Sequence, residues 1–212
     1  TIPSIWYFEP ANSMGFIPTD YVDITGAQTI DDYYTTDAHW RQEKLSAVAA
    51  KLADALGITI DTVYEQITSD VPFYGVYYGQ SALPLPADAL VYLTNETLQN
   101  CRVYDYETGG YIPVYDTGML SGKDPYQVFL SGSKSLLTIE NPSTATDREL
   151  SLFRDSFGSS IAPLFASGYA KITLVDIRYV SPNRLSRFID FDGKDVLFLY
   201  STSVLNSSET MK

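Results

Sequence analysis

The sequence predicts a single α/β domain, built on a sheet of parallel strands with a β-rich insertion in the middle of the chain. Three observations favour this fold. The last third alternates apolar strand patterns with helical patterns, and such alternation joins parallel strands through right-handed crossovers. The middle, at about residues 71–140, holds short runs rich in valine and tyrosine, which strands favour. The length of 212 residues suits one domain, residues 1–212, with a sizeable core.

The first quarter of the chain predicts a strand, a polar loop and a helix. The apolar run at residues 5–8 is closed by Glu9 and Pro10, which is typical of a short buried strand. A loop rich in polar residues, glycine and proline follows, at about residues 12–18. From 40 to 56, leucine, valine and alanine recur at helical spacing, and Gly57 ends the helix. A second short helix is predicted at 60–67.

The middle of the chain predicts antiparallel strands at 71–78, 89–93, 101–106 and 111–115. Gly109 and Gly110 mark a hairpin turn between the last two, and residues 127–130 and 136–140 are further candidate strands. The last third predicts strands at 150–153, 171–176 and 196–200, with helices at 157–166 and 183–188. We expect the tail from residue 206 to fray.

Composition excludes several classes of function. The net charge of −12 repels phosphate backbones and anionic membrane surfaces, so nucleic acid is not an expected partner. The charge also fits a role in solubility alone. No run of about 18 apolar residues is present, which predicts no transmembrane segment. Cys101 is the one cysteine, so neither an intramolecular disulfide nor a cysteine-rich metal site is expected. Because the chain begins at Thr1, we expect that a leader was removed.

Aromatic and acidic residues each leave two interpretations open. The 17 tyrosines pack in cores and strands, or form platforms for sugar rings. Asp31, Asp32 and Asp37 form a solvated acidic face, or supply oxygen ligands for calcium. They lack a recognisable calcium-loop signature, so we predict neither a metal site nor a cofactor.

Polar side chains follow the three predicted parallel strands, whose carboxyl ends meet at one edge of the sheet. One loop holds Ser156 at the start of a helix, where free backbone N–H groups could stabilise an oxyanion. The other loops hold the remaining candidates, which are Asp176, Arg178, Tyr179, Ser201 and Thr202. Arg178 could bind a substrate, or form an ion pair with Asp176 or Asp155.

A serine hydroxyl needs a base to become a nucleophile. His39 is the one histidine of the chain and is therefore the candidate base. Asp37 lies two residues earlier, close enough in a non-helical turn to orient the imidazole. Two other interpretations stay open, because His39 could be a structural hydrogen-bonding residue and Ser156 could be a helix N-cap.

Four segments resemble the bacterial DHHW protein family. The sequence YTTDAHW at 34–40 is similar to that family's Asp-His-His-Trp motif, and LSLFRDSFGSSIAP at 150–163 is similar to its second motif. The segments KITLVDIRY at 171–179 and DVLFLY at 195–200 resemble its closing segments. The resemblance spans the chain in order and is weakest in the β-rich middle.

This resemblance implies both a fold and an activity. The DHHW family is similar to SGNH hydrolases and to alginate O-acetylation enzymes, which share a circularly permuted form of that fold. The resemblance implies an SGNH hydrolase-like three-layer core, with Ser156 as nucleophile, His39 as base and Asp37 as orienting carboxylate. It also implies an exported esterase or O-acyltransferase, a secreted protein or lipoprotein. Its substrate would be a small-molecule or polysaccharide acyl ester, with possible partners in the cell envelope.

The sequence departs from the family pattern at three places. Ala38 replaces the first histidine of the motif, and Arg154 replaces the glycine of the usual Gly-Asp-Ser. Ser201 and Thr202 stand where an oxyanion-binding asparagine is expected. They are predicted, together with Gly158 and Arg178, to bind the oxyanion or substrate. The departures leave open a second function, a non-catalytic glycan-binding or structural surface protein that keeps the fold.

Overall fold

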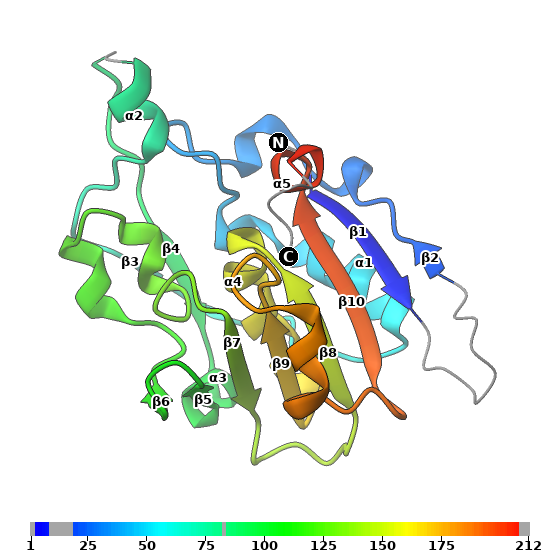
Figure 1. Ribbon diagram of the computed structural model, residues 1–212. Helices are drawn as coiled ribbons and strands as arrows, with labels where there is room; N and C mark the ends of the chain where they lie inside the picture. Colours follow the sequence, from blue (N-terminus) through cyan, green and yellow to red (C-terminus); the bar gives the residue numbers. More distant parts are fainter. Residues whose placement is uncertain (1–2, 9–18, 82–83, 208–212) are drawn as a thin grey trace.

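The computed structural model describes residues 3–8, 19–81 and 84–207 of the chain. Within these residues the chain forms an eight-stranded main sheet, shown in Figure 1, and a separate two-stranded sheet. In spatial order the main sheet consists of β2 (Thr19–Tyr21), β1 (Pro3–Phe8), β10 (Asp195–Ser201), β8 (Glu149–Arg154), β9 (Lys171–Val175), β7 (Leu136–Glu140), β5 (Arg102–Asp105) and β6 (Gly110–Ile112).

The centre of the main sheet is parallel, whereas both sides are antiparallel. β8 pairs in parallel with β10 and with β9, as the strand–helix alternation predicts. β1 pairs antiparallel with β10, β7 pairs antiparallel with β9, and β2, β5 and β6 continue the antiparallel sides. The prediction of a parallel sheet is therefore wrong outside the three central strands. Strands joined by tight turns, such as β5 and β6, pair antiparallel because a parallel pair needs a longer crossover.

The last third of the chain follows the predicted order of elements. The three predicted strands are β8, β9 and β10. The predicted helix at 157–166 is α4 (Ser156–Ile161), which continues as the 3₁₀ helix η6 (Ala162–Gly168). Pro163 lies at the start of η6, where its missing N–H ends the α-helical hydrogen-bond pattern. The helix predicted at 183–188 is the 3₁₀ helix η7 (Pro182–Arg187).

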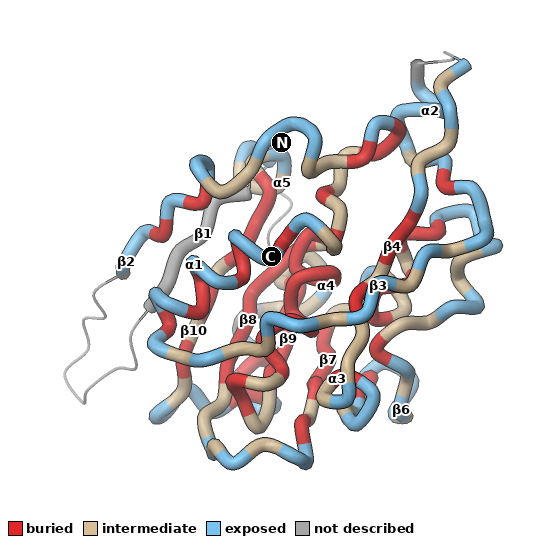
Figure 2. Tube along the Cα trace, turned by 180° about the vertical axis from the view of Figure 1, so that it is seen from behind, coloured by how far each residue is buried: buried red, intermediate tan, exposed pale blue. Residues whose placement is uncertain are grey.

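One face of the main sheet is covered by α1 (Ser46–Leu56), α4 and η6. Figure 2 shows α4 buried, whereas buried and exposed residues alternate along α1. Val48, Leu52 and Leu56 of α1 recur at helical spacing and are buried against the sheet. The helix ends at Gly57, whose φ of 62° is the left-handed C-cap conformation. The predicted helix began at residue 40, but residues 42–44 form the separate 3₁₀ turn η3 (Gln42–Lys44).

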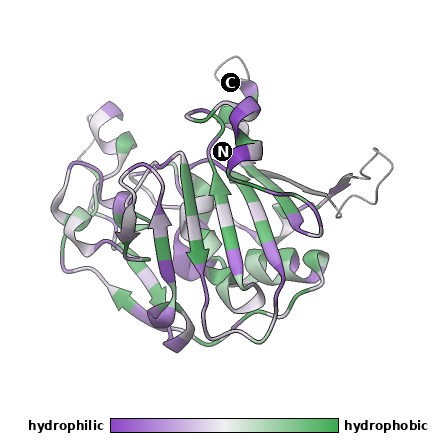
Figure 3. Ribbon diagram, turned by 60° about the horizontal axis from the view of Figure 1, so that its bottom comes forward, coloured by the Kyte–Doolittle hydropathy of each residue, from purple (hydrophilic) through white to green (hydrophobic). Residues whose placement is uncertain are grey.

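The opposite face of the central strands carries a second apolar cluster. Successive side chains of a strand point to opposite faces, so Phe153 of β8 and Val175 of β9 lie on this side. They are covered by Leu185 of η7 and by partly buried side chains of α5 (Thr202–Asn206). Figure 3 shows the hydrophobic bands along these strands. The sheet therefore has helical cover on both faces.

The predicted β-rich middle is divided between two places. β5, β6 and β7 extend the main sheet, with Gly109 at a φ of 69° in the predicted hairpin turn. β3 (Glu65–Thr68) and β4 (Val91–Thr94) pair with each other. The helix predicted at 60–67 and the strands predicted at 71–78 and 127–130 are wrong. The structure has β3, then α2 (Val76–Ser81), and the 3₁₀ helix η5 (Pro125–Val128).

Short helical turns make up the remaining elements. They are η1 (Thr25–Ala27), η2 (Ile30–Asp32), α3 (Glu96–Asn100) and η4 (Thr117–Ser121). The predicted loop at 12–18 and the tail beyond residue 207 lie outside the described residues. Across the described parts of the chain, no helix has the length and apolar character needed to cross a membrane.

Candidate active site

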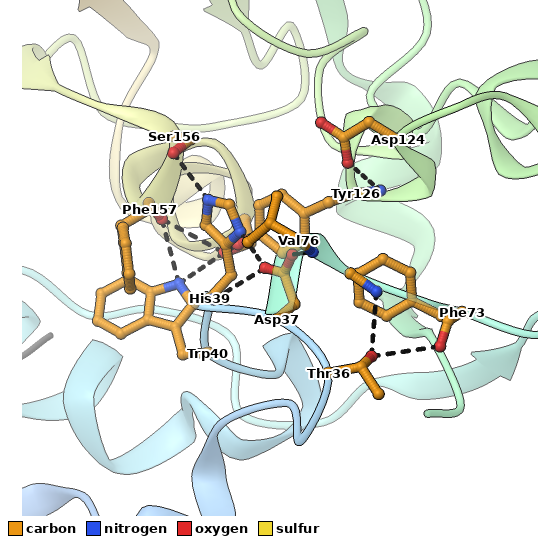
Figure 4. A network of polar contacts seen from close by, with 12 residues as sticks. Thr36, Asp37, His39, Trp40, Phe73, Val76, Asp124, Tyr126, Ser156 and Phe157 are labelled. Atoms are coloured by element: carbon orange, nitrogen blue, oxygen red, sulfur yellow. Dashed lines mark hydrogen bonds and ion pairs between the residues drawn. The ribbon is translucent and has the colours of Figure 1, made fainter. Parts of the chain in front are cut away.

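Three polar side chains predicted to act together meet at the carboxyl edge of the parallel strands. The Oγ of Ser156 lies 2.7 Å from Nε2 of His39, and Nδ1 of His39 lies 2.5 Å from Oδ1 of Asp37 (Figure 4). Ser156 is the first residue of α4, directly after β8, whereas the other two lie in the loop between η2 and η3. The imidazole therefore joins the carboxylate to the hydroxyl through its two nitrogens.

The loop that carries Asp37 and His39 is fixed by backbone hydrogen bonds. The carboxylate of Asp88 accepts from the N–H groups of Thr35 and Thr36 and from the Thr36 hydroxyl. The N–H of Tyr34 donates to the carbonyl of His39, which closes the turn. A loop held at these points keeps the imidazole in place without support from regular secondary structure.

Asp37 is buried and accepts hydrogen bonds from two elements. Oδ1 accepts from the backbone N–H of His39 at 2.9 Å, and Oδ2 accepts from the N–H of Val76 at 3.0 Å. Burial by itself raises the pKa of Asp37, but the hydrogen bonds from His39 and Val76 outweigh it and hold the pKa below its ordinary value. An ionised carboxylate at this position stabilises an imidazolium as it forms.

Gly75 allows this contact and was missed by the sequence analysis. An added Cβ at Gly75 would lie 2.6 Å from Cγ of Asp37 and still closer to its Oδ2. Glycine therefore lets the backbone before α2 approach the carboxylate closely enough for Val76 to donate to it. A lone glycine inside an apolar run is a sequence signal for such a close approach. Because a strand was predicted at 71–78, this glycine was not recognised as a site of close approach.

Aromatic rings fix the orientation of the imidazole. The ring of Tyr126 stacks on His39, with centroids 3.9 Å apart and an interplanar angle of 14°, and Phe157 packs against His39 at 4.9 Å. The Tyr126 hydroxyl donates to Oγ of Ser160 at 2.8 Å, and Nε1 of Trp40 donates to the same oxygen at 2.7 Å. Trp40 is fully buried. Tyr126 therefore acts as a positioning residue for His39.

Tyr126→Leu is expected to lower kcat for acyl turnover by about 10- to 100-fold, because a small displacement of a catalytic group carries a cost of that order. Tyr126→Phe keeps the stacked ring, so its kcat should stay within about threefold of the wild type. Steady-state kinetics well below the unfolding temperature measure both effects. Wild-type kcat in Tyr126→Leu would show that the ring does not position His39, and equal loss in both variants would assign the effect to the hydroxyl.

Ser156 lies at a turn that Asp155 organises. Asp155, rather than Ser156, is the N-cap of α4, and its carboxylate accepts from the N–H of Phe157 and from the N–H of Ser201. The N-cap interpretation of Ser156 is therefore wrong. Among the described residues, the backbone N–H of Ser156 has no hydrogen-bond partner. It is available to an oxyanion beside the serine.

Gly158 and Arg154 pack against each other directly beneath this turn. The N–H of Gly158 donates to the carbonyl of Asp155, and an added Cβ would lie 2.8 Å from Cγ of Arg154. Arg154 is fully buried, which lowers its pKa, and Nη2 donates to the carbonyl of Lys134. The structure thus gives Gly158 a packing role and uses its N–H within the turn, where the sequence predicted oxyanion or substrate binding.

The other predicted oxyanion or substrate residues make structural contacts. Nη2 of Arg178 lies 2.6 Å from the buried carboxylate of Asp176, and Nε also donates to it, which is the ion pair that the sequence left open. The hydroxyl of Ser201 accepts from the N–H of Val204 as the N-cap of α5. Thr202 is the first residue of α5, partly exposed, and no contact places it against Ser156.

Two acidic residues near the site form hydrogen bonds with other groups of the protein. Asp32 accepts from the backbone and the hydroxyl of Thr29, and Asp37 faces His39. Within the described ranges, no group of three or more histidine, cysteine or acidic side chains gathers in a way that could hold a metal ion. The calcium interpretation of Asp31, Asp32 and Asp37 therefore finds no geometric support.

Burial raises the pKa of the Cys101 thiol to about 11, and the nearby charge of Asp61 adds to the effect. The thiolate is the reactive form of cysteine, so alkylation of Cys101 by iodoacetamide is expected to be slow at pH 8. The rate should rise about tenfold for each pH unit until the pH approaches the pKa. Mass spectrometry of the alkylated peptide measures the rate, and rapid alkylation at pH 7 would contradict this assignment.

Comparisons with known proteins add a likeness in fold. No family model matches the chain, and no curated protein sequence matches it. Among solved structures, a DHHW family protein from Eubacterium siraeum is 22% identical, with a TM-score of 0.66 over 82% of this chain and 60% of that one. Bacillus cereus PatB1 with a sulfonyl adduct is 18% identical, with a TM-score of 0.64 over 82% of this chain and 62% of PatB1.

A second structure of Bacillus cereus PatB1 is 17% identical, with a TM-score of 0.59 over 82% of this chain and 64% of that one. The chain therefore spans less than two thirds of the proteins that it matches. At these identities the likeness concerns the fold. The expected resemblance to the DHHW family is confirmed at that level.

Proposed function

We propose that the protein is a serine-dependent acyl esterase or O-acyltransferase of SGNH-like type. Its substrate class is acylated, most simply O-acetylated, cell-surface carbohydrate. The observation that carries the proposal is the continuous chain from Asp37 through His39 to Ser156, with contacts of 2.5 and 2.7 Å. The parallel centre of the sheet, with helical cover on both faces, supports an SGNH-like core. The carbohydrate substrate class supports a location outside the cytoplasm.

In the first half of the reaction, Oγ of Ser156 attacks the carbonyl carbon of the ester while Nε2 of His39 takes the hydroxyl proton. The free N–H of Ser156 donates to the oxyanion of the tetrahedral intermediate. When the intermediate collapses, the bond to the alcohol oxygen breaks, and the imidazolium returns the proton to that oxygen. The acyl group is then an ester of Ser156.

In the second half, a water molecule or a sugar hydroxyl attacks the acyl group. His39 takes the proton from the attacking oxygen, and the second tetrahedral intermediate releases Ser156, which recovers its proton from the imidazolium. Attack by water gives hydrolysis, and attack by a sugar hydroxyl gives transfer. Asp37 holds the imidazole in the tautomer that presents Nε2 to the serine throughout.

Release of acetate from O-acetylated oligosaccharides, and formation of newly acetylated sugars, test the proposed function. Wild-type protein is expected to produce one or both, and Ser156→Ala is expected to produce neither. Ser46→Ala removes a hydroxyl from an exposed serine at the start of α1 and is the matched control. Turnover that survives in Ser156→Ala would refute the assignment of the nucleophile.

The second candidate function is a non-catalytic glycan-binding surface protein. It is favoured by one feature of the site, because the hydroxyl of Ser201 caps α5 where an oxyanion donor was expected. Glycan binding that is unchanged in Ser156→Ala, together with no ester turnover by the wild type, would favour this candidate. Ester turnover that depends on Ser156 would exclude it.

A further inference from the structure

A pocket of about 320 Å³ adjoins the site on the side of Asp37. Asp37 and Ala38 form part of its wall, whereas neither His39 nor Ser156 lines it. Asp37 contacts Nδ1 of the imidazole and Ser156 contacts Nε2, so the pocket lies beyond the carboxylate end of the triad. Within the lining, the carboxylate of Asp37 is one imidazole ring and two hydrogen bonds away from the Ser156 hydroxyl, a span that two linked sugar units can cover.

The lining of the pocket is rich in aromatic residues and carries one charged group. Tyr33, Tyr34 and Tyr77 contribute aromatic rings, and Gln28 contributes a side-chain amide. Asp37 is the one charged residue in the lining, and His39 and Val76 already bind its carboxylate. No basic side chain lines the pocket, so an anionic ligand would find no counter-charge there.

Two buried polar groups of the lining lack hydrogen bonds. Within the described part of the chain the hydroxyl of Tyr34 has no hydrogen-bond partner, and Tyr34 is only 4% exposed. The amide nitrogen of Gln28 is also unpaired, while its oxygen accepts from the Tyr33 hydroxyl. Buried polar groups in proteins are normally paired, so the wall of the pocket holds hydrogen-bonding capacity that the described residues leave unused.

Position 38 controls the space in this pocket. Ala38 lies between the orienting carboxylate and the base in the sequence, and this residue forms part of the wall. The motif that names the DHHW family has histidine here, a much larger side chain. A larger residue at position 38 would extend into the pocket and reduce its volume. The small side chain of this chain therefore leaves the pocket open.

Exposed tyrosines lie on α2 and on the residue two positions before it. Tyr77 lines the pocket and is 42% exposed. The rings of Tyr74 and Tyr78 pack at 4.5 Å beside it on the same segment. The N–H groups of Tyr77 and Tyr78 donate to the carbonyl of Thr36, which anchors α2 to the triad loop. Aromatic faces with hydroxyl groups at their edge suit the apolar face and polar rim of a sugar ring.

We propose that this pocket is a subsite for a neutral sugar unit of the carbohydrate, adjacent to the sugar whose ester reaches Ser156. The inference rests on the proposed function for its place in the reaction, but the binding of sugar is independent of turnover. Gln28 supplies its side-chain amide, Tyr33 and Tyr77 supply ring faces, and the small side chain of Ala38 admits the sugar. The subsite determines which glycans place an ester at the nucleophile.

Direct binding of neutral oligosaccharides tests the subsite. N,N′-diacetylchitotetraose and cellotetraose are the probes, and titration is followed by intrinsic fluorescence. Wild-type protein is expected to bind at least one probe in a saturable manner, with an affinity about tenfold weaker in Ala38→His and in Gln28→Ala. Tyr111→Ala removes an exposed tyrosine of β6, outside the pocket lining, and should leave the affinity within about twofold. No saturable binding by the wild type, or wild-type affinity in both Ala38→His and Gln28→Ala, would overturn the proposal.

A second measurement separates this inference from the proposed function. Labelling of Ser156 by a sulfonyl fluoride is measured with and without the bound oligosaccharide, and the ratio of the two rates is compared between proteins. In the wild type, bound oligosaccharide is expected to change the labelling rate, so the ratio differs from one. In Ala38→His the oligosaccharide should have no effect, so the ratio is one. If Ser156 is not labelled but the sugar still binds in the pocket, the proposed function fails and the subsite stands. If Ser156 is labelled at a rate that no oligosaccharide alters and none binds, the subsite fails alone.

Discussion

His39→Ala is expected to lower acyl turnover by roughly 10⁴-fold or more, the scale seen when the base of a serine–histidine–aspartate site is removed. Without the imidazole, nothing in contact with Oγ of Ser156 can take its proton, because Nε2 of His39 is its hydrogen-bond partner at 2.7 Å. Exogenous imidazole should restore part of the activity, since the space beside Tyr126 and Phe157 is then unfilled. Initial rates with an aryl acetate, with and without imidazole, measure both effects.

His39→Gln separates chemistry from structure at this position. Glutamine keeps hydrogen-bonding capacity toward Asp37 and Ser156 but cannot act as a base. Its activity should therefore be as low as that of His39→Ala, while thermal unfolding confirms that it folds. Substantial turnover in His39→Gln would show that His39 is a structural hydrogen-bonding residue, which is the alternative that the sequence left open.

Gly75→Ala is expected to lower kcat by about 10²-fold or more, as displacement of a catalytic group by about 1 Å does. The new methyl group would overlap the side chain of Asp37, with Cγ only 2.6 Å away. Either the carboxylate turns away from His39, or the segment before α2 moves and the hydrogen bond from Val76 breaks. In both cases the imidazole loses its fixed orientation. Steady-state kinetics, with the unfolding temperature recorded for each protein, measure the effect.

Gly79→Ala is the matched control for this change. Gly79 lies in α2, four residues after Gly75, and an added Cβ there would meet nothing within 4 Å. Alanine also favours helix over glycine by about 1 kcal/mol, so Gly79→Ala should keep wild-type kinetics. Equal kcat in Gly75→Ala and wild type would contradict the claim that the close approach of this segment holds Asp37.

The parts of the fold that the sequence predicted depend on local pattern. The alternation of apolar runs in the last third predicted β8, β9, β10 and α4, because the periodicity of a strand or a helix is visible in neighbouring residues. Sheet order could not be predicted in this way, since β1 and β2 come from the first residues of the chain, whereas β1 lies beside β10 from its end. Pairing between segments so far apart in the sequence cannot be predicted from the local pattern of residues.

The strand predicted at 71–78, in the middle of the chain, is wrong for a physical reason. Residues 71–78 are rich in tyrosine and valine, which strands favour, but the segment packs on the loop of Asp37 and turns into α2 instead. Tertiary contacts of Thr36 with the N–H groups of Tyr77 and Tyr78 decide the conformation there. Residue composition alone does not show such a partner.

Within the site, the residue types that carry chemistry could be proposed from the sequence, and the residues that hold them could not. His39 is the single histidine, so it was the one candidate base. Tyr126 and Gly75 are two among many tyrosines and glycines, and only the structure shows which ones touch His39 and Asp37. Arg178 was correctly given an ion pair as an alternative, because Asp176 lies two residues away.

The most direct test of the central claim, that His39 activates Ser156, is the site of covalent modification by a sulfonyl fluoride. Wild-type protein is incubated with the reagent, digested, and analysed by peptide mass spectrometry, beside His39→Ala and Ser46→Ala. If His39 activates Ser156, labelling of Ser156 is stoichiometric in the wild type and in Ser46→Ala and is lost in His39→Ala. Labelling of Ser156 at the wild-type rate in His39→Ala, or no labelling of Ser156 in the wild type, would contradict the claim.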